Sequence, residues 1–345
     1  MFSNNKIYLF ILILFSIFNS IQCNIYNYYE IRSKFLPAVN YSGGLCRVND
    51  DTQMKLLSRN LSKGDPAFAK KISNILSRYA AYFAVSIYDE ESGYTLNLNS
   101  NLIFHAASTY KAAILIALMR MDQQNKLALK DKILVENTFE SIIDRSPYSL
   151  EDDLSEPDTV FSNIGEHVSI KDLLNIMIEK SSNLATNVLV KNIGAQLIND
   201  TLNELGSKII VARGVSDHKA YADCINNVVN ASELESLYKI IYNENKIDLV
   251  HRKIILDILE KNSETSRLPG KLPDDVKVAH KPGNTSQVFH DAGIIIPQTG
   301  SPYFITILTS KYKSRKKITQ AIADVSLLVY QEVLKARHTA KTNNQ

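Results

Sequence analysis

Strand-like segments lie near the two ends of the predicted folded region, and a long helical stretch separates them. This arrangement limits the fold more than any other feature of the chain. YFAVSIYD (82–89) alternates apolar and polar residues, EESG makes a turn, and YTLNLN (94–99) returns, which predicts a hairpin. Three further strands are expected at 276–283, 288–296 and 302–310, and their short connections favour antiparallel pairing.

The stretch between these strands, about 108–260, repeats apolar residues at helical spacing. We expect helices within it at 169–180, 183–194, 195–206, 232–243 and 248–261. Amphipathic helices at 65–80, capped by Asp65, and at 318–336 would cover one face of the sheet. The predicted fold class is α/β (α+β): a five-stranded antiparallel sheet flanked by helices, plus an all-helical lobe, with the active site in the cleft between them.

The N-terminus has the pattern of an export signal. MFSNNK precedes the apolar run IYLFILILFSIF (7–18), which is too short for a comfortable membrane span. We predict a signal peptide at 1–23, a lead-in segment at 24–64, a catalytic domain at 65–337 and a tail at 338–345. The mature protein would be periplasmic or extracellular. A lipid anchor at Cys23 and an uncleaved anchor remain alternatives.

Charge and cysteine content exclude several classes of function. The formal net charge is +3, with 39 basic and 36 acidic residues, which does not indicate a nucleic-acid partner. Cys46 and Cys224 could pair in an oxidising compartment, but two cysteines make no disulfide framework. The absence of a CxxC or Cys/His cluster argues against structural zinc, and we expect no metal or other cofactor.

The stretch FHAASTYKAAILIALM (104–119) combines Ser108 and Lys111 with a helix that is apolar on all sides. Such a helix is buried, while its first turn would face the cleft. Residues at i and i+3 share a helix face, and a dehydrated lysine favours its neutral, basic form. Ser108 could therefore be a nucleophile with Lys111 as its base. Alternatively, Ser108 caps the helix and Lys111 reaches water, since Ser-x-x-Lys recurs five more times in the chain.

Two further motifs change the balance: Ser181-x-Asn183 at a break between two helices, and Lys281-x-Gly283 on a strand. In this order, the three motifs resemble the signature elements of serine β-lactamases and penicillin-binding proteins. The surrounding segments resemble the active-site blocks of class A β-lactamase-like enzymes. The resemblance covers roughly 65–337.

This resemblance implies an acyl-enzyme mechanism. Ser108 would attack a carbonyl, Lys111 would take or relay its proton, and Ser181 would pass a proton to the leaving nitrogen. On the binding side, the substrate would contact Asn183 and the Lys281-Pro282-Gly283 strand, with Lys281 attracting its carboxylate. The backbone N–H groups of Ser108 and Asn284 would form the oxyanion hole.

The chain also departs from the family pattern. Ser182 replaces the central Asp of Ser-Asp-Asn, for which we expect altered local packing. Pro282 replaces the Thr of Lys-Thr-Gly; it has no hydroxyl and no N–H, which predicts an edge strand and weaker carboxylate binding. The family's Arg on the next strand is missing, and His290 and Asp291 stand nearby; His290 would either face the ligand or bond within the cleft wall.

The largest departure concerns release of the acyl group. Class A enzymes use a Glu-x-x-Leu-Asn loop, whereas VARGVSDHKAYADCINNVVN (211–230) contains no Glu. Asp217 and Asp223 are the candidate deacylating residues, and Asn226 or Asn227 could replace the loop's Asn; capping and surface solvation are the alternative roles.

The leading hypothesis is an exported, monomeric serine hydrolase, acylated on Ser108, that hydrolyses β-lactams slowly. A peptidoglycan D,D-peptidase, or an esterase, of the same fold is the second. The third is a non-catalytic cell-envelope protein that binds a wall peptide or a partner.

Overall fold

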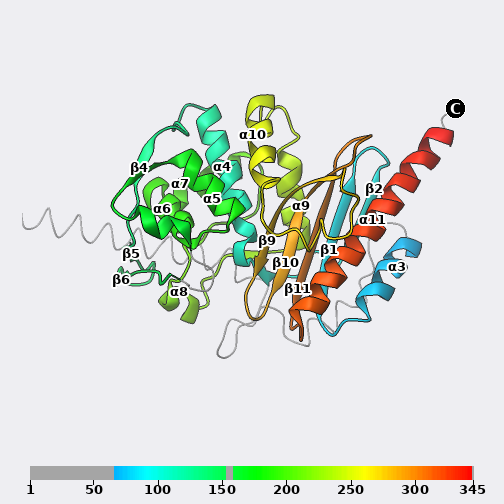
Figure 1. The fold of residues 1–345 in the computed structure, drawn as a ribbon, viewed down its shortest axis with the longest axis horizontal. Helices are drawn as coiled ribbons and strands as arrows, with labels where there is room; N and C mark the ends of the chain where they lie inside the picture. Colours follow the sequence, from blue (N-terminus) through cyan, green and yellow to red (C-terminus); the bar gives the residue numbers. More distant parts are fainter. Residues whose placement is uncertain (1–65, 153–157, 344–345) are drawn as a thin grey trace, which may run out of the picture. The chain divides into compact units, whose positions relative to one another are not determined.

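The computed structural model describes residues 66–152 and 158–343 (Figure 1). The predicted signal peptide, the lead-in segment, the cap at Asp65 and the pairing of Cys46 lie outside the described residues. Cys224 is described and its side chain is exposed. Within the described ranges, no helix is both long and apolar enough to cross a membrane.

The five predicted strands form one antiparallel sheet in the order β2-β1-β11-β10-β9. Their bounds are β1 (Tyr82–Asp89), β2 (Tyr94–Leu98), β9 (Lys277–Asn284), β10 (Phe289–Ile296) and β11 (Tyr303–Ser310). β1 pairs with β11, so the N-terminal hairpin joins the three C-terminal strands directly. β9 is an edge strand, as Pro282 within it predicted.

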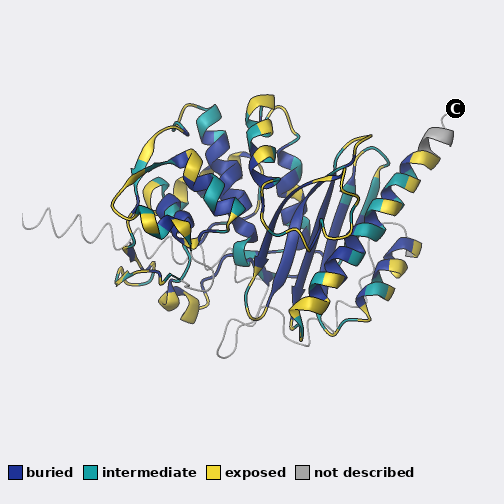
Figure 2. Cartoon of the chain, viewed as in Figure 1, coloured by how far each residue is buried: buried dark blue, intermediate teal, exposed yellow. Residues whose placement is uncertain are grey.

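The sheet is buried on both faces (Figure 2) because its strands alternate between two apolar layers. Val85 and Ile87 of β1 belong to the layer under α3 (Pro66–Leu76) and α11 (Arg315–Asn343). Ala84 belongs to the other layer, which continues into the helical lobe through α9 (Ala231–Ile240) and α10 (Leu249–Leu259).

The final helix is longer than the predicted 318–336, because α11 continues to Asn343, within the segment predicted as a tail. The last turns of this helix are anchored by Arg337, which is only 4% exposed. Its guanidinium pairs with the buried Asp89 at the end of β1 and donates to the backbone oxygen of Ser301. A buried ion pair near the end of the helix explains why it extends past the predicted boundary.

The helical lobe is built around α4 (Lys111–Gln123), most of whose residues are fully buried. The lobe also contains α5 (Ile170–Glu179), α6 (Asn183–Ile193), α7 (Ala195–Glu204) and the short α8 (His218–Ala222), of which α5 and α7 pack directly on α4. Ser169 caps α5 through the Asp172 N–H, as its sequence predicted.

The prediction that 108–260 is helical throughout was too simple. Short strand pairs also occur in or beside this stretch: β3 (Phe104–His105) with β8 (Val228–Val229), β4 (Lys132–Leu134) with β7 (His167–Ser169), and β5 (Phe139–Glu140) with β6 (Pro147–Tyr148). The stretch further contains the 3-10 helices η1 (Ala107–Tyr110) and η2 (Thr159–Asn163). Two or three residues are too few to show a strand period.

Candidate active site

Ser108 lies in η1, the tight turn that leads into α4, and its side chain is half-buried. The residue before it, Ala107, has a φ of +47°, which is unfavourable for a residue with a Cβ. The Ala107 N–H donates to His105 Nδ1 at 3.0 Å and Thr109 Oγ1 donates to the Ala106 oxygen at 2.7 Å, so this backbone is held. No side chain caps η1 or α4, which argues against a capping role for Ser108.

Lys111 is completely buried and does not reach water. Its Nζ donates to the backbone oxygen of Ser181 at 2.6 Å, to Asn183 Oδ1 at 2.9 Å and to the Ser182 oxygen at 3.2 Å. Burial, and secondarily the charge of Lys281, lower the pKa of Lys111 well below its usual value. This shift favours the neutral amine, the form that has a lone pair and can accept a proton.

Ser181 occupies the turn between α5 and α6 with a φ of +59°. Its Oγ accepts hydrogen bonds from Lys281 Nζ at 3.0 Å and, more weakly, from Lys111 Nζ at 3.4 Å. Lys281 is 1% exposed, and burial lowers its pKa to about 7, with Asp291 acting to raise it and Arg267 to lower it. One hydroxyl thus lies between two amines with lowered pKa values, an arrangement suited to proton transfer.

Gly283 brings the edge of β9 into direct contact with η1. A Cβ at this position would lie 2.7 Å from the Ser108 nitrogen and 2.9 Å from the Thr109 nitrogen, so only glycine fits. The contact places the end of β9, including Asn284, beside the backbone of Ser108. Ser108 and Asn284 both line the two cavities at this end of the cleft.

Ser182 caps α6 and contacts a carboxylate, that of Asp158, which comes from another segment of the chain. Its Oγ accepts from the Ala185 N–H, which caps α6, and donates to Asp158 Oδ2 at 2.7 Å. The Leu184 N–H also donates to Asp158 Oδ2. Asp158 therefore supplies a carboxylate beside the central residue of the motif. No local pattern in the sequence indicated this residue.

The loop that follows α7 reaches the smaller cavity through Val215. Asn187 holds this residue on both sides: its Oδ1 accepts from the Val215 N–H at 2.6 Å, and its Nδ2 donates to the Val215 oxygen at 2.9 Å. The neighbouring Gly214 packs so closely that a Cβ would lie 2.5 Å from Asn187 Oδ1. The backbone of Val215 is therefore fixed in the wall of a cavity that Ser108 also lines.

The structure places Asp217 in the wall of the smaller cavity and Asp223 outside both cavities. Asp217 lines the smaller cavity but is 1% exposed, and its carboxylate accepts from Ser141 Oγ and the Ile142 and Ala220 N–H groups. It caps α8 and fixes the loop, the alternative role named for it. Asp223 is exposed at the end of α8 and lines neither cavity.

The two asparagines proposed for this loop also serve its structure. Arg213 Nη2 donates to Asn226 Oδ1 at 2.6 Å, and Asn227 Oδ1 accepts from the Ala212 N–H at 2.7 Å. Asn227 lines the smaller cavity and Asn226 lines neither.

His290 belongs to the cleft wall rather than to the ligand-facing surface. It is fully buried, its Nε2 contacts the His105 backbone oxygen at 2.9 Å, and its Nδ1 accepts from the Thr309 N–H at 3.0 Å. Burial lowers the pKa of His290 to about 3, so it is neutral. Of the two roles considered for His290, the structure favours the wall.

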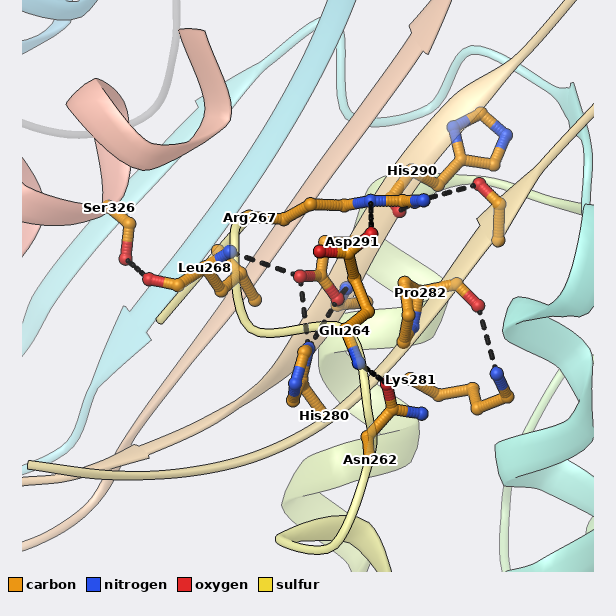
Figure 3. Close-up of polar contacts among 12 residues, drawn as sticks. Asn262, Glu264, Arg267, Leu268, His280, Lys281, Pro282, His290, Asp291 and Ser326 are labelled. Atoms are coloured by element: carbon orange, nitrogen blue, oxygen red, sulfur yellow. Dashed lines mark hydrogen bonds and ion pairs between the residues drawn. The ribbon is translucent and has the colours of Figure 1, made fainter. Parts of the chain in front are cut away.

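A cation missed by the sequence analysis, Arg267, lies at the end of β9 (Figure 3). It comes from the segment before this strand and lines the larger cavity. Its guanidinium donates to the His290 oxygen and to Asn284 Oδ1, both at 2.7 Å, and stacks on the Phe289 ring at 3.7 Å. Arg267 thus supplies a cation at the end of β9, where the next strand carries no arginine.

The two cavities, of about 390 and 950 Å³, meet at Ser108, Asn183, Ser216 and Asn284. Lys281 and Ser181 line the larger one, whose volume suits a small-molecule substrate. Among the described residues, no group of three or more His, Cys, Asp or Glu side chains could hold a metal ion.

Comparison with known proteins agrees with the family resemblance of the sequence motifs and extends over most of the chain. A model of the Beta-lactamase enzyme family matches residues 67–333. β-Lactamase VEB-1 of Pseudomonas aeruginosa is 25% identical over 75% of this chain and 88% of its own length. A β-lactamase of Bacillus subtilis (strain 168) is 22% identical over 87% and 92%.

Solved structures agree on the fold. The structure of PBP-A has a TM-score of 0.67 and 22% identity, covering 78% of this chain and 97% of its own. An ancestral class A β-lactamase also has a TM-score of 0.67, with 19% identity, covering 77% and 99%. The chain therefore belongs to the Beta-lactamase enzyme family and has the fold of β-lactamases and penicillin-binding proteins.

Proposed function

We propose that this protein is a serine hydrolase that is acylated on Ser108 by β-lactams and releases the acyl group slowly. The observation that carries the proposal is the Ser181 hydroxyl, held between the buried amines of Lys111 and Lys281 beside Ser108. Each amine has a lowered pKa, and pairs of groups tuned in this way are typical of acid–base sites.

The chemical steps follow from these positions. Ser108 Oγ attacks the lactam carbonyl carbon while its proton passes to the neutral amine of Lys111. The C–N bond then breaks, and the Ser181 hydroxyl gives its proton to the leaving nitrogen and is reprotonated through the neighbouring amines. The backbone N–H groups of Ser108 and Asn284 stabilise the oxyanion, and each such donor typically contributes about 10²–10³-fold in rate.

Binding of the substrate uses the polar groups at the cleft. Asn183 Oδ1 is held by Lys111, so the remaining amide hydrogens of Asn183 are directed for a substrate amide. Lys281 and Arg267 supply positive charge for a carboxylate near the end of β9. Pro282 has no hydroxyl to donate to that carboxylate, so we expect the two cations to bind it without the help of a neutral donor at this position.

Slow release follows from the wall of the smaller cavity. Hydrolysis of the ester needs a base that removes a proton from water near Ser108. The residue fixed there by Asn187 is Val215, and the carboxylate of Asp217 already accepts three hydrogen bonds. The acyl-enzyme should therefore accumulate.

Intact mass spectrometry during incubation with benzylpenicillin tests the proposal. We expect the protein mass to rise by one penicillin and to return slowly. Ser108→Ala should abolish the adduct, whereas Ser236→Ala should be acylated normally. Ser236 also begins a Ser-x-x-Lys sequence, but it is exposed on α9 and lines neither cavity. Absence of an adduct on the unmodified protein would contradict the proposal and favour a non-catalytic binding protein.

A second candidate, a D,D-peptidase acting on peptidoglycan peptides, is favoured because Asp217, already hydrogen-bonded within the loop, is the one carboxylate among the residues that line the smaller cavity. Release of D-alanine from a peptide ending in D-Ala-D-Ala would support it, with Ser108→Ala as the control. Both substrate classes lie outside the cytoplasm, so we also propose export directed by residues 1–23. Retention in the cytoplasm of the full-length chain would refute export.

A further inference from the structure

The backbone that precedes Ser108 is strained, and a histidine ring holds it. Ala107 has a φ of +47°, which a residue with a Cβ keeps only when its surroundings fix it there. Gly283 of β9 packs so closely against this turn that an added Cβ would lie 3.1 Å from Ala107 Cβ. The Ala107 N–H donates to His105 Nδ1 at 3.0 Å, so an imidazole fixes the backbone one residue before the candidate nucleophile.

The strand that carries His105 is itself attached to the main sheet by a second histidine. β3 is only two residues long and pairs with β8, outside the five-stranded sheet. His290 on β10 (Figure 3) donates from Nε2 to the His105 backbone oxygen at 2.9 Å, and its Nδ1 accepts from the Thr309 N–H of β11 at 3.0 Å. The His290 ring packs edge-on against Phe104, with the ring centres 5.6 Å apart. Hydrogen bonds therefore connect β11 to Ala107 through two histidines.

These bonds fix the tautomer of both rings. In each ring Nδ1 accepts from a backbone N–H, so Nδ1 holds the lone pair and the proton lies on Nε2. His105 also lines the smaller cavity together with Ser108. Because the lone pair of His105 is already used by Ala107, this ring is placed to orient the turn and not to take a proton from water.

We propose that His105 is a positioning residue for Ser108: its neutral ring, attached to the sheet through His290, fixes the strained backbone of Ala107 and thereby places the Ser108 hydroxyl and N–H for the reaction. We call the hydrogen-bonded series Thr309–His290–His105–Ala107 the histidine tether. Its effect on acylation rests on the proposed function, whereas the tether itself belongs to the unliganded protein.

The surroundings of His105 favour the neutral ring that the tether needs. Burial, and secondarily the charge of Arg213, lower the pKa of His105 from 6.5 to about 4. Burial also lowers the pKa of His290 to about 3. The other titratable groups that contact the ring or line its cavity are Tyr221 of α8, Asp217 and His218.

Protonation of His105 would break the tether, because a charged imidazole has no lone pair at Nδ1. The folded-state pKa lies below the usual 6.5, so the contribution of this group to stability is complete above about pH 6.5 and is lost as the pH falls towards 4. In the folded protein the ring stays neutral until the pH approaches 4. Acylation near neutral pH therefore uses the intact tether.

The direct test is NMR of the unmodified, full-length protein without ligand, labelled with ¹⁵N. A coupling between the Ala107 nitrogen and His105 Nδ1 across their hydrogen bond is expected, together with the Nε2–H tautomer of His105 at neutral pH. Absence of this coupling, or a His105 ring that is charged or protonated on Nδ1 at neutral pH, would overturn the proposal. Because no substitution is involved, this test holds even where a variant fails to fold.

Two variants of His105 separate positioning from stability. His105→Phe keeps a ring but has no acceptor, whereas His105→Asn offers an amide oxygen close to the place of Nδ1. We expect His105→Phe to lower the acylation rate at saturating benzylpenicillin by about 5- to 10-fold, the typical effect of one hydrogen bond, with the half-saturating concentration unchanged. His105→Asn should recover most of the rate.

His251→Phe is the matched control. His251 on α10 bonds to Asp122 and Asp248 and lines neither cavity, so its loss should lower the melting temperature and leave acylation unchanged. A folded His105→Phe protein that acylates within about twofold of the unmodified rate would make His105 a structural residue and refute the inference. If penicillin does not acylate the unmodified protein, the proposed function fails, while the NMR coupling still decides whether the tether exists.

Discussion

Gly283→Ala should impair the reaction more than it impairs the fold, because its methyl group would enter the contact between β9 and the turn that carries Ser108. The new Cβ would lie 2.7 Å from the Ser108 nitrogen, 2.9 Å from the Thr109 nitrogen and 3.1 Å from Ala107 Cβ. Two of these atoms are backbone and cannot rotate away. The strand and the turn must separate instead.

The size of that separation determines how much the acylation rate should fall. An ordinary contact begins at 3.4 Å, so the Ser108 nitrogen must move by about 0.7 Å relative to β9. This movement widens the oxyanion hole between Ser108 and Asn284, and a misplacement of about 1 Å in an active site can lower a rate by about 10²-fold. We expect acylation to fall by roughly 30- to 100-fold, with a loss of about 1–3 kcal/mol in stability from overpacking.

The assay is the rate of adduct formation with benzylpenicillin, followed by intact mass, together with thermal unfolding. Gly300→Ala is the control for a loss of stability alone: its φ of +87° also disfavours a side chain, but it lies in the β10–β11 turn beside Arg337 and Glu91. It should lower the melting temperature and leave acylation intact. A Gly283→Ala protein that acylates within about threefold of the unmodified rate would refute the close-contact argument.

Three further changes test other parts of the molecule. Val215→Glu should place a carboxylate in the cavity wall beside the acyl group, so the penicillin adduct should disappear faster in the mass time course; an unchanged lifetime would show that this wall does not limit release. Ser182→Asp restores the family motif but sets a carboxylate against Asp158, so it should lower the melting temperature at neutral pH, and Asp158→Ser should recover it. Arg337→Met leaves the buried Asp89 without its opposite charge and should destabilise the protein by about 3–5 kcal/mol in chemical unfolding, with acylation of the folded protein unchanged.

The sequence predicted the elements whose signals are local and long. The eight-residue strands β1, β10 and β11 carry β-rich runs between turns, and helices such as α5 have a cap and an apolar stripe. The strand pairs β3–β8, β4–β7 and β5–β6 were missed because each joins two or three residues from distant segments. The end of α11 was missed because the anchoring of Arg337 by Asp89 is also non-local.

In the active site, too, the residues with a local sequence pattern were predicted, and those that act through contacts between distant segments were missed. Ser108 and Lys111 lie three residues apart, so their pattern is visible in the chain. Asp158 and Arg267 reach the site from segments that carry no motif, and only the folded contacts show that they lie beside Ser182 and Asn284. A missing motif residue is therefore weak grounds for inferring lost chemistry, because another segment can supply the same group at the same place.

In the cavity wall around Val215, no distant segment of the described chain supplies the carboxylate that the loop lacks. Asn187 fixes its backbone on both sides, while the nearest acidic side chain in the loop, Asp217, is already committed to Ser141 and the Ala220 N–H. The groups that support acylation are thus present in altered positions, whereas a base for hydrolysis is absent from this wall of the described cleft. In the proposed mechanism, formation and release of the acyl-enzyme depend on different residues, so we expect them to respond separately to mutation: Gly283→Ala should slow formation, and Val215→Glu should shorten the lifetime.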